Sequence, residues 1–378
     1  MTSAHLSGYY FLSFAFIGTF APFFSLYLHG IGSSAREIAI LMAVMQSMRL
    51  FGPYLWGSWT DKGLPLKRAI ALTTLGSLCG LSAFTIASSF SGMFIAIAAL
   101  SLFWSGTLPL LETLTFAYIE DRVVHYGPIR TWGSLGFLGA VLAVGKLLDL
   151  YSFTIVPWVC GLILLSLLPI SLVLPDALPR NKSRMSGHLP NFKAALFQPT
   201  VLSLLGASFL MATAHGAFNV FYSIHLSEHG YGGLEISALW ALGVAAEMLV
   251  FTQMPYLNRL FSPRTLLITC FAAAILRFAV IGWCVASISF LAFAQILHAL
   301  SFGAHHAVSV SSINRCFTGG NQTKAQAIYA SSHGGGTLLG SLTSGVLWSA
   351  FGSGWTFTSS SLLAFGGMIM IIIFIRQE

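Results

Sequence analysis

Hydrophobic residues gather along the chain in twelve long runs, separated by polar breaks or breaks containing proline or glycine. None of the runs alternates polar and apolar residues with a period of two, which excludes a β-barrel. A helix needs about 20 apolar residues to cross a bilayer. The runs therefore predict twelve membrane-spanning helices, at about 6–29, 37–59, 69–89, 92–117, 128–147, 152–174, 198–226, 232–255, 264–286, 288–312, 324–350 and 355–375.

The composition agrees with a membrane protein. Only 8% of the 378 residues are charged and 56% are hydrophobic, whereas about 25% of the residues in a soluble domain are charged. This excludes a soluble enzyme, a disordered chain and a nucleic-acid-binding protein. If the N-terminus is cytoplasmic, fourteen of the 18 Lys and Arg residues fall on the cytoplasmic side, and only Arg36 and Lys146 on the other. The positive-inside rule then places both termini in the cytoplasm, so the net charge of +7 is an orientation signal.

The chain divides into two related halves. The stretch from Phe23 to Leu28, followed by Gly32 and Glu37, reappears 198 residues later as Phe221 to Leu226, Gly230 and Glu235. We expect an N-terminal six-helix bundle over 1–174, a cytoplasmic linker over 175–197 and a C-terminal six-helix bundle over 198–378. Two pseudo-symmetric six-helix bundles are typical of transporters that work by alternating access.

A short motif follows the second predicted helix. Gly57-Ser58-Trp59-Thr60-Asp61-Lys62-Gly63 is followed by Lys67-Arg68. This resembles the G-x-x-x-D-(R/K)-x-G motif of the major facilitator superfamily, with its trailing basic pair. The resemblance implies the all-α fold of twelve membrane-spanning helices in that superfamily. It also implies a conformational gating role for Gly57, Asp61, Lys62, Gly63 and Arg68.

A narrower resemblance covers most of the chain. The stretch from Tyr126 to Ser134, the stretch from Gly243 to Glu247 and the stretch from Gln295 to His298 resemble the phenylpropionate-permease group. That group is similar to the lactose and nucleoside proton symporters. The resemblance implies proton-coupled symport of an aromatic carboxylate such as 3-phenylpropionate.

Three ionisable residues in the predicted helices form the first candidate site. Glu247, Arg277 and His298 lie in predicted helices eight, nine and ten, where such groups are costly and usually functional. Burial raises the pKa of a carboxylate and a nearby arginine lowers it, so Glu247 could load and release a proton. Lactose permease is similar, but it carries its glutamate in helix ten. The alternative is a static buried ion pair.

The second candidate site is a set of substrate-binding residues. Glu112 and Arg130 should meet across a short turn, where the arginine could grip a carboxylate, or the two could form a structural salt bridge. Arg49 is offset from Glu247 by the same 198 residues and should flank the same cavity, unless it pairs locally. His215, Asn219 and Tyr222 share one helix face. We expect that face to line the cavity, the alternative being that His215 bonds to a backbone carbonyl.

Other classes of protein find little support in the sequence. The H-E-x-x-H and Walker A motifs are absent, so we expect no enzyme and no ATP-driven pump. The adjacent His305 and His306 point to different helix faces, and we expect no metal site and no cofactor. The predicted partners are a small solute, a proton and the lipid bilayer, with no nucleic acid. We expect a monomer in a bacterial-type cytoplasmic membrane. A sugar or nucleoside symporter and a proton-antiport efflux pump stay open as alternatives.

Overall fold

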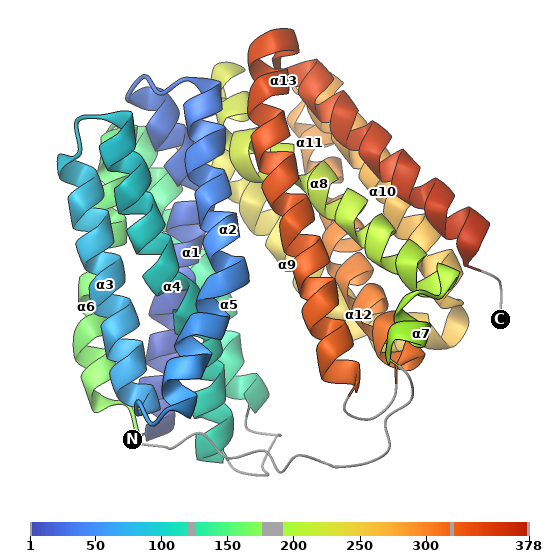
Figure 1. Cartoon of the computed structure of the whole chain (residues 1–378). Coiled ribbons are helices and arrows are strands. Elements are labelled where there is room, and N and C mark those ends of the chain that lie inside the picture. Colours follow the sequence, from blue (N-terminus) through green and yellow to red (C-terminus); the bar gives the residue numbers. More distant parts are fainter. Residues whose placement is uncertain (1, 120–125, 176–191, 318–320, 376–378) are drawn as a thin grey trace. The chain divides into compact units, whose positions relative to one another are not determined.

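A computed structural model describes residues 2–119, 126–175, 192–317 and 321–375. These residues are almost entirely helical (Figure 1). The first seven elements are α1 (Thr2–Gly30), α2 (Ala35–Asp61), α3 (Leu66–Ile86), α4 (Phe90–Ile119), α5 (Tyr126–Leu150), the 3₁₀ turn η2 (Phe153–Ile155) and α6 (Val156–Val173). The others are α7 (Phe192–Leu196), α8 (Pro199–Glu228), α9 (Gly233–Leu260), α10 (Pro263–Trp283), α11 (Ile288–His298), the π-helical η3 (Ala299–Ala304), α12 (His305–Cys316) and α13 (Asn321–Phe374).

The hydrophobic runs become helices long enough to cross a membrane. Eleven such segments lie within the described residues. This is one fewer than the twelve predicted, because α13 contains both of the last two predicted helices. Within α13 the backbone breaks at Gly352, whose φ of 78° is not helical. This break falls between the predicted ranges 324–350 and 355–375, so α13 is two spanning arms joined by a sharp turn. The all-helical membrane fold is confirmed.

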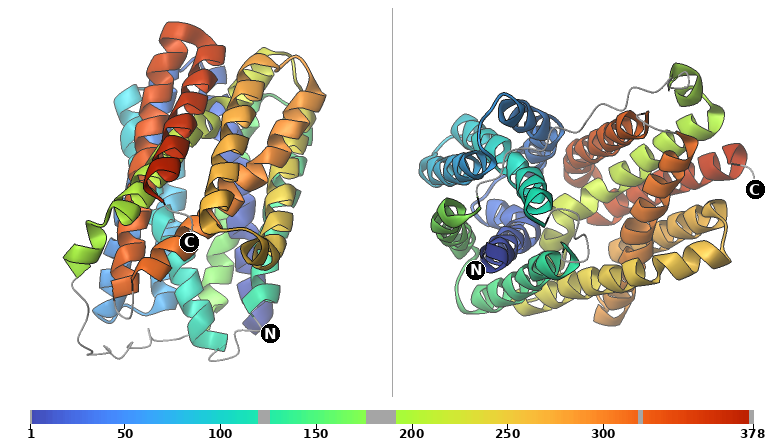
Figure 2. Two further views of the ribbon diagram at one scale, coloured as in Figure 1. Left: turned by 90° about the vertical axis from the view of Figure 1, so that its right-hand side faces the viewer. Right: turned by 90° about the horizontal axis from the view of Figure 1, so that it is seen from below.

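Chain contacts divide the protein into two compact units. Unit 1 comprises residues 1–182 and 232–237, and unit 2 comprises 183–231 and 238–378. In unit 1, α1 packs against α5 and α6, while α4 packs against α2 and α3. In unit 2, α8 runs along α13, which also packs against α10 (Figure 2). The predicted linker 175–197 lies mostly outside the described residues.

The 198-residue repeat extends to local geometry. Gly32 and Gly230 each lie two residues beyond the end of a helix, α1 and α8, and both have a φ of 88°, which a residue with a side chain rarely adopts. In the first copy the Ser34 backbone N–H donates to Glu37 Oε2 at 2.8 Å, and in the second the Gly232 N–H donates to Glu235 Oε2 at 2.8 Å. The two turns therefore share one capping arrangement.

Candidate functional site

Arg277 lies at the centre of a buried polar cluster in unit 2. Its side chain is 0% exposed, and Nη1 lies 3.2 Å from His215 Nε2 and 3.5 Å from the Ser301 hydroxyl. On the other side of its ring, His215 Nδ1 is 2.9 Å from the carbonyl oxygen of Met211. Because a guanidinium can only donate, His215 must accept at Nε2 and donate from Nδ1. This geometry fits a neutral His215, and it contains the backbone bond that was the alternative for this residue.

The acid of the cluster is on α9. Glu247 Oε2 lies 3.8 Å from His298 Nε2 at the end of α11, and the two side chains are 19% and 10% exposed. The three residues predicted as a proton-coupling set thus lie in one cluster, in which the charges of Glu247 and Arg277 act on each other. Glu247 pairs with His298, whereas the hydrogen bonds of Arg277 go to His215 and Ser301. The described contacts show no static ion pair between Glu247 and Arg277.

A π-helical segment joins the two parts of the cluster, and the sequence reasoning missed it. Ser301, within η3, donates from its hydroxyl to the His298 carbonyl at 3.4 Å and accepts from Arg277. A Cβ added at Gly303 would lie 2.8 Å from Glu247 Cγ, so the glycine lets η3 approach the acid without displacing its side chain. Single π turns inside α-helices occur frequently at functional sites.

Aromatic rings surround the cluster. The Phe218 ring centroid lies 4.1 Å from the Arg277 guanidinium carbon, a cation–π distance. The same ring lies 4.6 Å from Tyr222 and 4.8 Å from Trp240. Of the three predicted residues on this face of α8, His215 and Tyr222 are buried and Asn219 is half-buried.

Unit 1 carries a separate cluster around Arg130. This half-buried guanidinium lies 4.0 Å from the Phe14 ring centroid. The Tyr126 hydroxyl donates to Glu112 Oε1 at 3.5 Å, and the Tyr126 ring stacks on Phe116 at 4.7 Å. Glu112 and Arg130 were predicted to meet directly. The structure places Tyr126 in contact with both, because its side chain also bonds to Arg130, and the charge of Arg130 acts on Glu112.

The remaining predicted residues are mostly exposed. Arg49 is exposed on α2. Asp61, Lys62, Gly63 and Arg68 are exposed around the turn between α2 and α3, and Gly57 is half-buried. Gly63 has a φ of 103°, whereas an added Cβ at Gly57 would meet no atom within 4 Å. Backbone geometry therefore explains the glycine at 63 and leaves the one at 57 unexplained.

We expect Gly63→Ala to destabilise the protein and Gly57→Ala to leave stability almost unchanged. Alanine at a positive φ costs about 1 kcal/mol, and Gly57 is helical with open space beside it. Thermal melting of the purified variants in detergent measures both effects. Equal melting temperatures would show that the turn does not require its left-handed residue.

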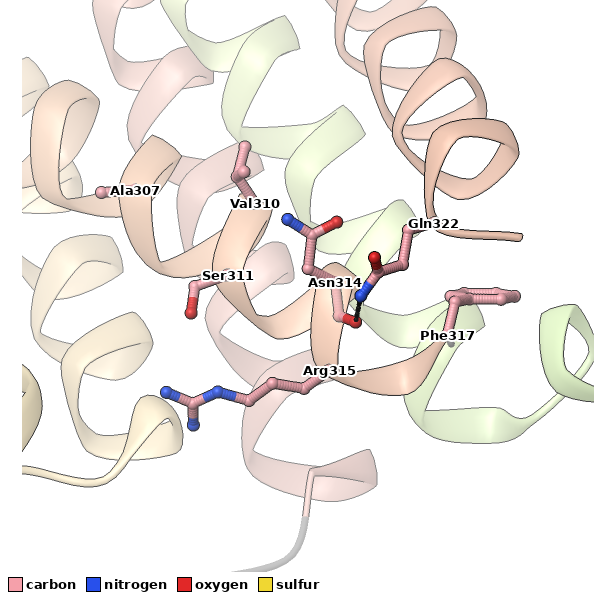
Figure 3. A pocket seen from close by; sticks show the side chains of 7 residues that line it. All are labelled: Ala307, Val310, Ser311, Asn314, Arg315, Phe317 and Gln322. Atoms are coloured by element: carbon pink, nitrogen blue, oxygen red, sulfur yellow. Dashed lines mark hydrogen bonds between the residues drawn. The ribbon is translucent and has the colours of Figure 1, made fainter. Parts of the chain in front are cut away.

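An open groove of about 600 Å³ lies at the end of α12 (Figure 3). Gln322 Nε2 donates to the Asn314 carbonyl at 3.2 Å on one side, and the exposed Arg315 side chain extends away from this pair. None of the predicted site residues lines the groove. We therefore keep the two clusters above as the candidate site.

Comparison with known proteins identifies the family. Residues 3–359 match the model of the MFS_1 like family. The chain is 26% identical over 362 residues to the "Probable 3-phenylpropionic acid transporter" of Escherichia coli (strain K12), covering 96% of this chain and 95% of that one. It is 30% identical over 244 residues to the "Maltose permease" of Geobacillus stearothermophilus, covering 63% and 61%.

Solved structures show the same fold. The nucleoside transporter NupG superposes with a TM-score of 0.85 at 19% identity, covering 99% of this chain and 98% of that one. The chain belongs to the MFS_1 like family. It is a multi-pass membrane transporter of the major facilitator type and not an enzyme.

Proposed function

We propose that this transporter carries a small organic solute, with an aromatic carboxylate such as 3-phenylpropionate favoured, in symport with protons by alternating access. It acts as a monomer in a bacterial-type cytoplasmic membrane, with both termini in the cytoplasm. The relative whose name includes 3-phenylpropionic acid matches nearly the whole chain, which supports the choice of solute. The distribution of Lys and Arg supports the orientation.

The observation that carries proton coupling is the Glu247–His298 pair beside Arg277. Glu247 is mostly buried, yet one of its oxygens faces a histidine ring at 3.8 Å. Ionisable groups within membrane-spanning helices mark proton relays in many transporters. His215 is held between Arg277 and a backbone carbonyl, so Glu247 and His298 remain as the proton carriers of this cluster.

The unit 1 cluster supports an aromatic solute. Arg130 keeps one face on Phe14, with Tyr10 at 5.9 Å, and its planar group can contact a ring by its face or a carboxylate by its fork. Glu112 adds an acceptor in the same cluster. We assign solute binding to Arg49, Glu112, Arg130, His215, Asn219 and Tyr222, and gating to the α2–α3 turn.

A transport assay tests the proposal. The purified chain is reconstituted into liposomes whose outside is more acidic than their inside. Uptake of labelled 3-phenylpropionate, maltose and a nucleoside is measured together with proton entry. Acid uptake that collapses with a protonophore is expected. Proton-driven uptake of the sugar or nucleoside alone would replace the solute assignment. Proton entry on solute release from the vesicles would indicate antiport efflux.

We expect Arg130→Lys to weaken binding of the aromatic acid about tenfold. Lysine keeps the charge but loses the planar face that stacks on rings, and loss of a cation–π contact of about 1–2 kcal/mol corresponds to about tenfold. Binding isotherms of the purified variant measure this. The exposed Arg36 gives a control, Arg36→Lys, with wild-type affinity. Unchanged affinity in Arg130→Lys would leave Arg130 with a structural role.

A further inference from the structure

Arg277 has donor atoms that its surroundings do not satisfy. Its side chain is 0% exposed, and its hydrogen bonds to His215 and Ser301 both use Nη1. Nε and Nη2 have no hydrogen-bond partner among the described residues. A buried donor without an acceptor is strongly unfavourable. The free edge of this guanidinium is therefore suited to an anion.

A second buried donor lies in the same cluster. Gln295 is 1% exposed, and its Nε2 faces the hydroxyl of Tyr222, which has no other hydrogen-bond partner among the described residues. A Cβ added at Gly243 would lie 2.8 Å from Gln295 Oε1 and 3.5 Å from His298 Cδ2, so these two side chains converge on one spot. The free edge of Arg277 and the amide of Gln295 both present N–H donors. Their complement is a ligand rich in acceptors, such as a carboxylate.

The rim of this donor cluster is apolar. The Phe218 ring lies over Arg277 and contacts Trp240. The Trp240 N–H is already bonded to Ser223 at 3.0 Å, so the rest of the indole offers apolar surface. A ligand with an acidic end and an aromatic or other apolar body matches both parts. In the present arrangement Phe218 covers the guanidinium, so such a ligand binds when that ring turns aside.

We propose that the carboxylate of the solute binds to the free edge of Arg277, with Gln295 as a second donor, in exchange for protonation of Glu247. This rests on the proposed function, and it adds the binding atoms and the stoichiometry: one proton moves with each monocarboxylate, so transport is electroneutral. Glu247 is the acid whose charge acts on Arg277. One guanidinium can balance one carboxylate, and a second ionised carboxylate would leave a buried net negative charge.

The titratable and charged groups around Glu247 fit this charge balance. His298 on α11 and Arg277 on α10 act on Glu247 directly. Arg277 also interacts with His215 and Tyr222 on α8, and His215 in turn interacts with His305 on α12 and His333 on α13. Arg277 is the permanent charge among them, and His215 is held neutral by its two hydrogen bonds. The proton that enters on the acidic side forms an O–H bond on Glu247, remains there while the solute carboxylate occupies Arg277, and leaves on the other side. No other bond forms or breaks.

Uptake under a clamped membrane potential tests the stoichiometry. Liposomes containing the full-length protein take up 3-phenylpropionate down a fixed pH gradient, with the potential set by potassium and valinomycin. The expected rate is the same at inside-negative, zero and inside-positive potentials, and one proton enters per acid. A rate that rises severalfold with an inside-negative potential would overturn the inference, because positive charge would then move with the solute.

A matched pair of ligands tests the binding atoms without altering the protein. The acid and its uncharged amide, 3-phenylpropanamide, have nearly the same shape, and the acid is expected to bind at least tenfold more tightly. Gln295→Leu should lower the affinity for the acid about tenfold, whereas Gln253→Leu, at an exposed glutamine on α9, should not.

Two outcomes separate this inference from the proposed function. Equal binding of acid and amide, or proton-driven uptake of a neutral solute with no acid binding, overturns the role of Arg277 and leaves proton symport intact. If no solute moves protons at all, the proposed function fails as well. A Gln295→Leu protein that melts like the wild type and binds the acid equally well removes Gln295 from the site.

Discussion

Replacing Glu247 by Gln is expected to abolish proton-driven accumulation of the solute while leaving exchange of solute across the membrane intact. Glutamine has the shape of a protonated glutamate and fits beside His298 and Gly303, where the acid now lies. It cannot release a proton, so the step that links solute movement to the pH gradient is lost. Uptake should fall to the equilibrium level, while counterflow of labelled for unlabelled solute continues.

The control for this variant lies on the same helix. Glu235 is exposed at the start of α9, and its carboxylate caps the Gly232 backbone. Glu235→Gln removes an acid from α9 without touching the cluster, and it should accumulate solute like the wild type. Accumulation by Glu247→Gln at the wild-type level, in vesicles with the same pH gradient, would end the assignment of Glu247 as the proton carrier.

The sequence predicts the spanning helices well because the bilayer imposes a simple rule. Each helix must be long and apolar, so hydrophobic runs and their breaks locate the elements. Even the break within α13 at Gly352 lies between two predicted runs. The same rule points to candidate residues such as Glu247 and Arg277, because charges in apolar runs are rare and costly.

Partner choice within the site could not be predicted in the same way. The sequence places Glu247, Arg277 and His298 at similar depth, but the rotation of each helix and the side-chain conformers decide which atoms meet. The π segment η3 changes the register within predicted helix ten, and nothing in the composition of that run reveals it. The contacts of Arg277 with His215 and Ser301 therefore became visible only in the structure.

The other large expected effect is on folding, and it comes from substituting a glycine where two helices pack closely. Helix α5 carries one glycine at such a contact and one outside it. The sequence identifies Gly133, Gly136 and Gly139 as a track of small residues, and such tracks allow helices in lipid to approach closely. The structure separates their roles. A Cβ added at Gly136 would collide with the backbone carbonyl of Phe11 on α1, whereas one at Gly139 would meet no atom within 4 Å.

Gly136→Val should therefore prevent normal folding of unit 1, while Gly139→Val should fold. A backbone carbonyl cannot move aside as a flexible side chain can, so the valine must push α5 away from α1, and overpacking of this kind costs about 3 kcal/mol or more. That is a large part of the 5–15 kcal/mol that typically stabilises a folded protein. Size-exclusion profiles and melting curves of the two detergent-purified variants would show the difference. The contrary result would be a Gly136→Val protein that is monodisperse and has the same melting temperature as Gly139→Val. It would mean that α1 and α5 can separate at little energetic cost, as expected of helices that slide past each other during transport.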